Sequence, residues 1–283
     1  MTSIVAAALA DEPIIAAIPL GLIVPFAAVF GAIIGSFLNV VVWRVPRGMS
    51  IVKPRSKCPR CGTGIAWYDN IPVISWLVLR AKCRHCGEPI SWQYPLVESF
   101  TALAFGLIVW AGFAGLVPLA VLPALLVFMA YSIALSLIDI QKGLLPNAIV
   151  LPAYPVIAVL LVLASWATGD WSALLHASIG GATLFAFFFV VWFVYPAGIG
   201  YGDVKLAGLL GLMLGWFGWA PLLVGAFAGF LIGAVVGVIV MIARRTGRKT
   251  SIPFGPSLLA GVWVGIFLGA AIGQWYLQLF GIA

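Results

Sequence analysis

The chain has 283 residues, of which 64% are hydrophobic and 8% are charged. Soluble globular proteins carry about 25% charged residues, so this composition excludes a domain surrounded by water and indicates a protein that lies mostly in lipid. The chain has fifteen Lys and Arg residues against eight Asp and Glu residues, and nine of those fifteen cations lie within residues 44–86, the stretch that also holds all four cysteines.

The N-terminal residues are followed by a series of long apolar runs. The first dozen residues contain an apolar stretch without a basic segment before it, which argues against a cleaved signal peptide. Runs of about 20 apolar residues predict transmembrane helices. Eight spans are expected, and the sixth is short and Gly-rich and could tilt or partly unwind; they lie near residues 18–43, 96–113, 117–138, 148–166, 175–195, 204–219, 221–243 and 254–280.

These runs predict an all-α polytopic membrane protein of about eight transmembrane helices. Together with the cysteines described below, they predict a small zinc-stapled cytoplasmic loop domain. The expected parts are an N-terminal segment with the first helix (1–43), a cysteine-containing loop domain (44–95) and a seven-helix core (96–283). Eight spans with the loop inside place every Lys and Arg on the cytoplasmic side, as the positive-inside rule requires. Both termini are then expected on the opposite side. The many small residues within the spans indicate close helix packing.

The loop contains two C-x-x-C pairs with 21 residues between them. The pairs are Cys58 with Cys61 and Cys83 with Cys86, and a glycine follows each pair. Four thiolates at this spacing favour tetrahedral zinc. Two disulfides would need the opposite topology, because a reducing cytoplasm disfavours them, and a redox pair is the remaining alternative. His85, between two cysteines, is interpreted as a solvated neighbour because the cysteine set is complete.

The basic residues of the loop have two possible partners, lipid and nucleic acid. Their position beside the first and second spans favours a role in orientation and in contact with anionic membrane lipid. Because the rest of the chain is nearly uncharged, no nucleic-acid partner is expected. No residue pattern indicates an oligomeric state.

Two of the eight acids lie at the predicted cytoplasmic edge of the membrane. Asp139 ends the third span and Asp203 follows Gly202 at the start of the sixth. Placing an acid at this depth in the membrane costs free energy, so these two residues are functional candidates. Two neighbouring carboxyls can share a proton, one activating water while the other protonates the substrate. If the two acids meet in space, they predict aspartic peptide hydrolysis without a metal.

Several further motifs, in a fixed order, carry a family resemblance. The chain resembles the type IV prepilin peptidases, bifunctional leader peptidases and N-methyltransferases of the bacterial inner membrane, which are related to the GxGD aspartyl proteases. The motifs are Gly35-Ser36-Phe37-Leu38-Asn39-Val40-Val41, the two C-x-x-C pairs enclosing Trp67-Tyr68-Asp69-Asn70-Ile71-Pro72 and Ser75-Trp76-Leu77, Ile90-Ser91-Trp92-Gln93-Tyr94-Pro95-Leu96-Val97-Glu98, Leu137-Ile138-Asp139, Gly200-Tyr201-Gly202-Asp203-Val204-Lys205-Leu206 and Pro253-Phe254-Gly255-Pro256.

The resemblance implies cleavage of the basic leader from type IV prepilins and pseudopilins, after a Gly at the cytoplasmic membrane face. It implies Asp139 and Asp203 as the catalytic acids, and N-methylation of the new N-terminus with S-adenosylmethionine. Asn147 departs from an Asp found in many members, which puts only a secondary contact in doubt. No G-x-G-x-x-G pattern marks a place for the methyl donor, so its binding residues are unknown.

Other polar residues have a structural and a functional interpretation. Asp69 and Glu98 are candidates for contact with the leader or the methyl donor, against an ordinary structural hydrogen bond. For Asn39 a helix-packing hydrogen bond is favoured over a substrate contact, and Lys205 is expected to mark the membrane interface.

Two functions of other classes remain open at this point. A transporter could use the two acids as a proton relay or a cation site, but no inverted repeat and no acid near the bilayer midplane supports it. A zinc-stapled scaffold of a secretion machine would tolerate Asn at both acidic positions. The substrates are not identified, and pilus assembly, secretion and DNA uptake are not distinguished.

Overall fold

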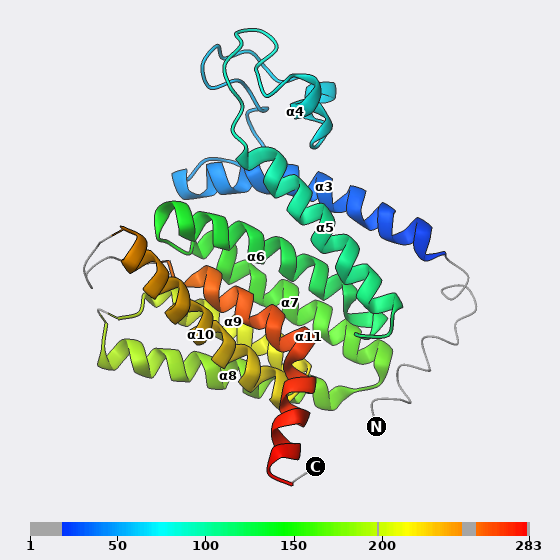
Figure 1. The fold of residues 1–283 in the computed structure, drawn as a ribbon, viewed down its shortest axis with the longest axis vertical. Helices are drawn as coiled ribbons and strands as arrows, with labels where there is room; N and C mark the ends of the chain where they lie inside the picture. The colour runs from blue at the N-terminus through cyan, green and yellow to red at the C-terminus, as the bar shows by residue number, and fades with distance from the viewer. Residues whose placement is uncertain (1–18, 197, 245–252, 282–283) are drawn as a thin grey trace. The chain divides into compact units, whose positions relative to one another are not determined.

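Apart from turns and a long irregular loop between residues 44 and 93, the described residues are helical (Figure 1). The structure, a computed structural model, describes residues 19–196, 198–244 and 253–281, so the predictions on residues 1–12 and on the basic cluster 245–249 lie outside the described residues. Under the labels of Figure 1, the helices are α3 (Leu20–Arg44), α4 (Ile74–Val78), α5 (Gln93–Phe113), α6 (Leu122–Lys142), α7 (Asn147–Thr168), α8 (Trp171–Val194), α9 (Tyr201–Trp216), α10 (Trp219–Arg244) and α11 (Gly255–Leu279).

The predicted membrane class is confirmed. Seven helical stretches among the described residues are long and apolar enough to cross a membrane, so the chain is a multi-pass membrane protein. The remaining expected span, the sixth, is α9, which forms within a few residues of its predicted position but has only 16 residues. At 1.5 Å per residue it reaches about 24 Å, less than the roughly 30 Å hydrocarbon core. Its Gly-rich sequence stays helical throughout.

The chain divides into two compact units, Met1–Ala134 and Leu135–Ala283, with the boundary inside α6. The three-part division expected from the sequence follows the loop and the spans rather than compactness, and it stays a prediction.

In the first unit, α3 packs along α5 through two glycines. A Cβ added to Gly31 would lie 2.6 Å from the Thr101 carbonyl oxygen, and one added to Gly35 would lie 2.8 Å from the Glu98 Cα. Larger side chains would therefore push the two helices apart, as expected for helix contacts in lipid. Arg44, at the end of α3, donates hydrogen bonds to the carbonyl oxygens of Ser50 (2.9 Å) and Pro54 (2.7 Å), which fixes where the loop leaves the helix.

In the second unit, glycine contacts join two further helix pairs, α8 with α9 and α10 with α11. A Cβ on Gly211 would lie 2.3 Å from the Gly180 carbonyl oxygen, and one on Gly261 would lie 2.3 Å from the Gly229 amide nitrogen. Most of α9 is buried, because α7, α8, α10 and α11 all contact it. Close packing on all sides explains why α9 remains helical despite its glycines.

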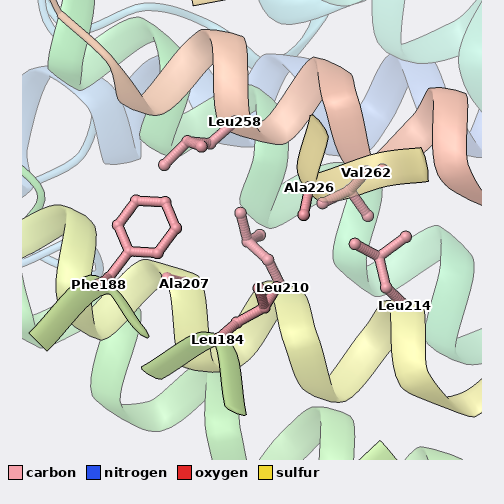
Figure 2. Close-up of a pocket in the computed structure, with 9 residues that line it drawn as sticks. Leu184, Phe188, Ala207, Leu210, Leu214, Ala226, Leu258 and Val262 are labelled. Carbon is pink, nitrogen blue, oxygen red and sulfur yellow. The ribbon is translucent and has the colours of Figure 1, made fainter. Parts of the chain in front are cut away.

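A small pocket lies among α8, α9, α10 and α11 (Figure 2). Only apolar residues line it, among them Phe188, Leu210 and Leu258. Its lining offers no acid, base or charged group, so this pocket holds no candidate for acid–base chemistry.

Candidate active site and metal site

Asp139 lies in the last turn of α6 with its carboxyl group buried. Its Oδ2 accepts a hydrogen bond of 3.0 Å from the backbone N–H of Gly255, the first residue of α11. The first N–H groups of a helix have no partner within the helix, and the positive end of the dipole favours an anion there. The N-terminus of α11 thus binds the Asp139 carboxylate through the Gly255 N–H.

Asp203 is held in the same manner by its own helix. It occupies the first turn of α9, and its Oδ2 accepts a hydrogen bond of 3.2 Å from the Gly200 N–H. This is the acidic half of a capping box. Each candidate acid therefore receives a backbone N–H at the N-terminus of a helix.

The second unit brings the two acids together. Asp139 and Asp203 lie close enough for their carboxyl charges to repel each other, and one residue, Leu145, packs beside both acid-bearing segments. A Cβ on Gly255 would lie 3.3 Å from Leu145 Cδ2, and a Cβ on Gly202 would lie 3.2 Å from Leu145 Cβ. Two interacting carboxyls suit a reaction in which one is ionised and the other protonated.

The segment that follows Asp139 turns sharply between α6 and α7. After α6 ends, Gly143 adopts a positive φ of 62°, and Pro146 directly precedes α7. The turn returns the chain to the same end of the helices, where Asn147 accepts a hydrogen bond from Lys205 Nζ. Lys205 Nζ also lies 4.9 Å from the centre of the Tyr201 ring, so two neighbours hold this lysine in place.

Replacing Asn147 by Asp is expected to change the rate of substrate cleavage little. It would turn the hydrogen bond from Lys205 into an ion pair, and an exposed pair contributes about 0–1 kcal/mol. We expect Asn147→Asp to cleave substrate within about fivefold of the unmodified rate, since 1 kcal/mol corresponds to roughly that factor. A rate constant measured at equal protein abundance checks this; a change of two orders of magnitude would place Asn147 in the catalytic machinery.

The four cysteines gather in the loop of the first unit. Their sulfur atoms lie within 4.8 Å of one another, and Cys58 Sγ and Cys86 Sγ are 3.7 Å apart. A tetrahedral ion with bonds of about 2.3 Å separates its sulfur ligands by about 3.8 Å. All four cysteines are free, so the cluster could hold a metal ion.

Each C-x-x-C pair forms the same tight turn. The Cys58 N–H donates to the Thr63 carbonyl (2.9 Å) and the Cys83 N–H donates to the Glu88 carbonyl (2.8 Å). The glycines after the pairs, Gly62 and Gly87, adopt positive φ angles of 72° and 71°, which glycine does without steric cost. Both glycines are therefore turn residues.

Contacts around the cluster shift the pKa values of its thiols in both directions. Thr63, whose hydroxyl lies 3.4 Å from Cys61 Sγ, lowers the pKa of the Cys61 thiol to about 6 by hydrogen bonding, whereas burial and the neighbouring thiols raise the pKa of the Cys86 thiol to about 11. The thiolate is the form that binds metals. An ion pair between Arg60 and Glu88 connects the two turns.

The other candidate residues make structural contacts. Asp69 pairs with Arg84 through two hydrogen bonds of 2.6 and 2.9 Å, and the guanidinium holds the pKa of the Asp69 carboxyl below its usual range. Glu98 accepts the Val73 N–H at 2.7 Å. Asn39 donates to the carbonyls of Gly35 and Tyr94, both at 3.3 Å, and so connects α3 with the start of α5. The structural interpretation of Asn39 is supported.

Comparisons with known proteins match the two parts of the chain that hold these residues. Residues 29–112, which include the cysteines, match the bacterial peptidase A24 N-terminal domain, and residues 126–242, which include both acids, match the type IV leader peptidase family. No solved structure matches the chain.

Curated relatives share most of the chain and one name, prepilin leader peptidase/N-methyltransferase. A Pseudomonas aeruginosa protein is 35% identical over 279 residues, covering 89% of this chain and 92% of the relative. An Aeromonas hydrophila protein is 34% identical over 291 residues, with 89% and 92% covered. A Myxococcus xanthus protein is 42% identical over 232 residues, with 80% and 65% covered.

Proposed function

Because the chain belongs to the type IV leader peptidase family, we propose that it removes the basic leader of type IV prepilins and pseudopilins with Asp139 and Asp203 as the catalytic pair. The relatives named prepilin leader peptidase/N-methyltransferase support this enzyme class and its substrates. The observation that carries the residue assignment is the pair itself: two interacting carboxyls, each at a helix N-terminus.

The reaction follows from the two protonation states of such a pair. The ionised carboxylate takes a proton from water while the water oxygen bonds to the scissile carbonyl carbon, and the protonated carboxyl donates to the carbonyl oxygen. When the tetrahedral intermediate collapses, the C–N bond breaks and the leaving nitrogen receives a proton. One water is consumed and no metal takes part. The backbone N–H groups of Gly255 and Gly200 keep the carboxyls in position.

The location of the enzyme is part of the proposal. A bacterial inner membrane, with the cysteine loop and the acid pair facing the cytoplasm, agrees with the positive-inside rule. A prepilin with a cytoplasmic basic leader and an apolar helix would present its cleavage site at that membrane edge.

Cleavage of a purified prepilin by the purified protein in nanodiscs tests the function. We expect mass spectrometry to find a cut directly after a Gly that follows the basic leader. A transporter or a non-catalytic scaffold would leave the prepilin intact.

We propose methylation of the new N-terminus as the second activity, with S-adenosylmethionine as the methyl donor. The relatives' shared name supports it. Adding S-adenosylmethionine to the cleavage reaction should increase the product mass by one methyl group. If the product mass stays unchanged although cleavage is complete, the chain is a peptidase alone.

We propose zinc as the ion of the cysteine cluster. Zinc fits four thiolates in a tetrahedron, and a structural site of this kind supplies folding energy to a small loop with little core. Its role is to hold the fold of the loop between α3 and α5, and it takes no part in the hydrolytic step.

Loss of one zinc ligand should release the loop. In Cys83→Ser we expect the bound metal to be lost and cleavage by an added protease between Ile51 and Ser91 to increase, because metal binding at such sites contributes about 10 kcal/mol or more to folding. Metal analysis and limited proteolysis measure both effects. The matched control is His85→Ala, next to a ligand but outside the cluster, which should keep its metal. Retained metal in Cys83→Ser, or metal lost in both variants, would contradict the assignment.

A further inference from the structure

Helix α4 in the loop exposes an apolar face. Ile74, Leu77 and Val78 are 57%, 61% and 69% exposed. Residues three and four apart lie on the same side of a helix, so the three side chains form one continuous surface. Large apolar side chains gathered in this way indicate a contact surface rather than scattered exposure.

The opposite face of α4 is polar and packed. Ser75 is buried, and its hydroxyl donates to the Tyr68 carbonyl and accepts from the Ile71 N–H, both at 2.9 Å. Trp76 lies against Trp92 with ring centres 4.1 Å apart, and its Nε1 donates to the Ile90 carbonyl. The hydrogen bonds fix which side of α4 faces the loop. The helix therefore turns a serine inward and its aliphatic residues outward, the reverse of a helix in water.

A hydrogen bond to α5 holds the start of α4 in position. The Val73 N–H, directly before α4, donates to Glu98 in the second turn of α5. Val73 has a φ of 61°, a strained conformation for a β-branched residue, which this contact holds in place. Glu98 is five residues beyond the start of the candidate span Gln93–Phe113, or about 8 Å along the helix. Interfacial helices bury their apolar face at a depth of about 5–10 Å.

The surroundings of the apolar face suit a lipid surface. Leu96, one turn into the same candidate span, is also 63% exposed. Two exposed cations, Arg80 and Lys82, follow α4. The two acids of the loop are both engaged in ion pairs, Asp69 with Arg84 and Glu88 with Arg60, so little negative charge opposes an anionic membrane.

We propose that α4 is an interfacial helix that lies in the leaflet at which α3 ends and α5 begins. Ile74, Leu77 and Val78 contact the acyl chains, and Arg80 and Lys82 contact anionic headgroups. The contact anchors the loop to the membrane at a second point besides its two flanking helices. It does not depend on the catalytic assignment.

Photocrosslinking of the full chain tests this contact. The photoreactive residue p-benzoylphenylalanine replaces Val78 in one variant and His85, exposed at the turn of the second cysteine pair, in the matched control. Both are placed in nanodiscs of phosphatidylcholine and phosphatidylglycerol and illuminated. We expect at least about tenfold more lipid adduct at position 78 than at position 85, because only the first lies within the acyl region. Metal content and size-exclusion profiles establish that both variants are folded.

Two outcomes would overturn the proposal. One is equal lipid adduct, or none, at both positions. The other appears when a prepilin is added: a crosslink from position 78 that moves from lipid to the prepilin would identify the apolar face as a protein-docking surface. No step of the test requires turnover, so failure of the cleavage reaction leaves its result unaffected.

Discussion

Replacing either Asp139 or Asp203 by Asn is expected to lower the rate of leader cleavage by at least about 10³-fold, because the amide can neither take a proton from water nor donate one with carboxylic acidity. Asn keeps the size of the side chain and one carbonyl oxygen to accept the N–H of Gly255 or Gly200. The loss should therefore lie in the rate and not in protein abundance. Cleavage of a prepilin in membranes at equal enzyme abundance measures it.

The double variant separates a joint mechanism from two independent contributions. If the two carboxyls act as one unit, Asp139→Asn with Asp203→Asn should be within about tenfold of either single variant, since removing one member already disables the pair. Asp170→Asn is the matched control, because Asp170 caps α8 by accepting hydrogen bonds from the Ala173 N–H and the Ser172 hydroxyl. It should cleave at the unmodified rate. Effects that multiply in the double variant would argue against a pair.

Gly255→Ala is expected to lower the cleavage rate about 10–100-fold while the protein stays folded. The added Cβ would lie 2.8 Å from Asp139 Oδ2, so the carboxylate has to move away from its N–H donor. Displacement of a catalytic group by about 1 Å can cost 10²-fold in rate. Rate constants, together with thermal unfolding of the same preparations, separate the two effects.

The control for this variant is a glycine in open space. A Cβ added to Gly21, in α3, meets no atom within 4 Å, so Gly21→Ala should retain both rate and stability. A Gly255→Ala protein that cleaves normally would show that the hydrogen bond between Gly255 and Asp139 does not position the carboxylate.

Hydropathy predicted most of this fold because membrane spans depend on local composition. The expected spans 148–166 and 221–243, for example, correspond to α7 and α10 within a few residues. The length of α9 was harder to predict, since its apolar character comes from burial among four helices rather than from contact with lipid. Sequence alone does not distinguish these two surroundings.

Within the candidate site, the sequence predicted the two acids but not the backbone groups that hold them in position. Asp139 and Asp203 stand out because so few acids occur among the spans. Gly255 was part of a quoted motif but had no assigned role, because its contact with Asp139 joins residues 116 positions apart. The role of Glu98 likewise depends on the unusual φ of Val73, which no residue pattern predicted.

The most direct test of the central claim is binding of a substrate analogue in which a hydroxyethylene group replaces the scissile peptide bond. Its hydroxyl imitates the tetrahedral intermediate and should lie between the two carboxyls, so the unmodified protein should bind it at least about 10²-fold more tightly than the uncleaved substrate. The account predicts that Asp139→Asn and Asp203→Asn both lose this preference while still binding the substrate. Equal preference in the unmodified protein and both variants would contradict the assignment of Asp139 and Asp203 as the catalytic pair.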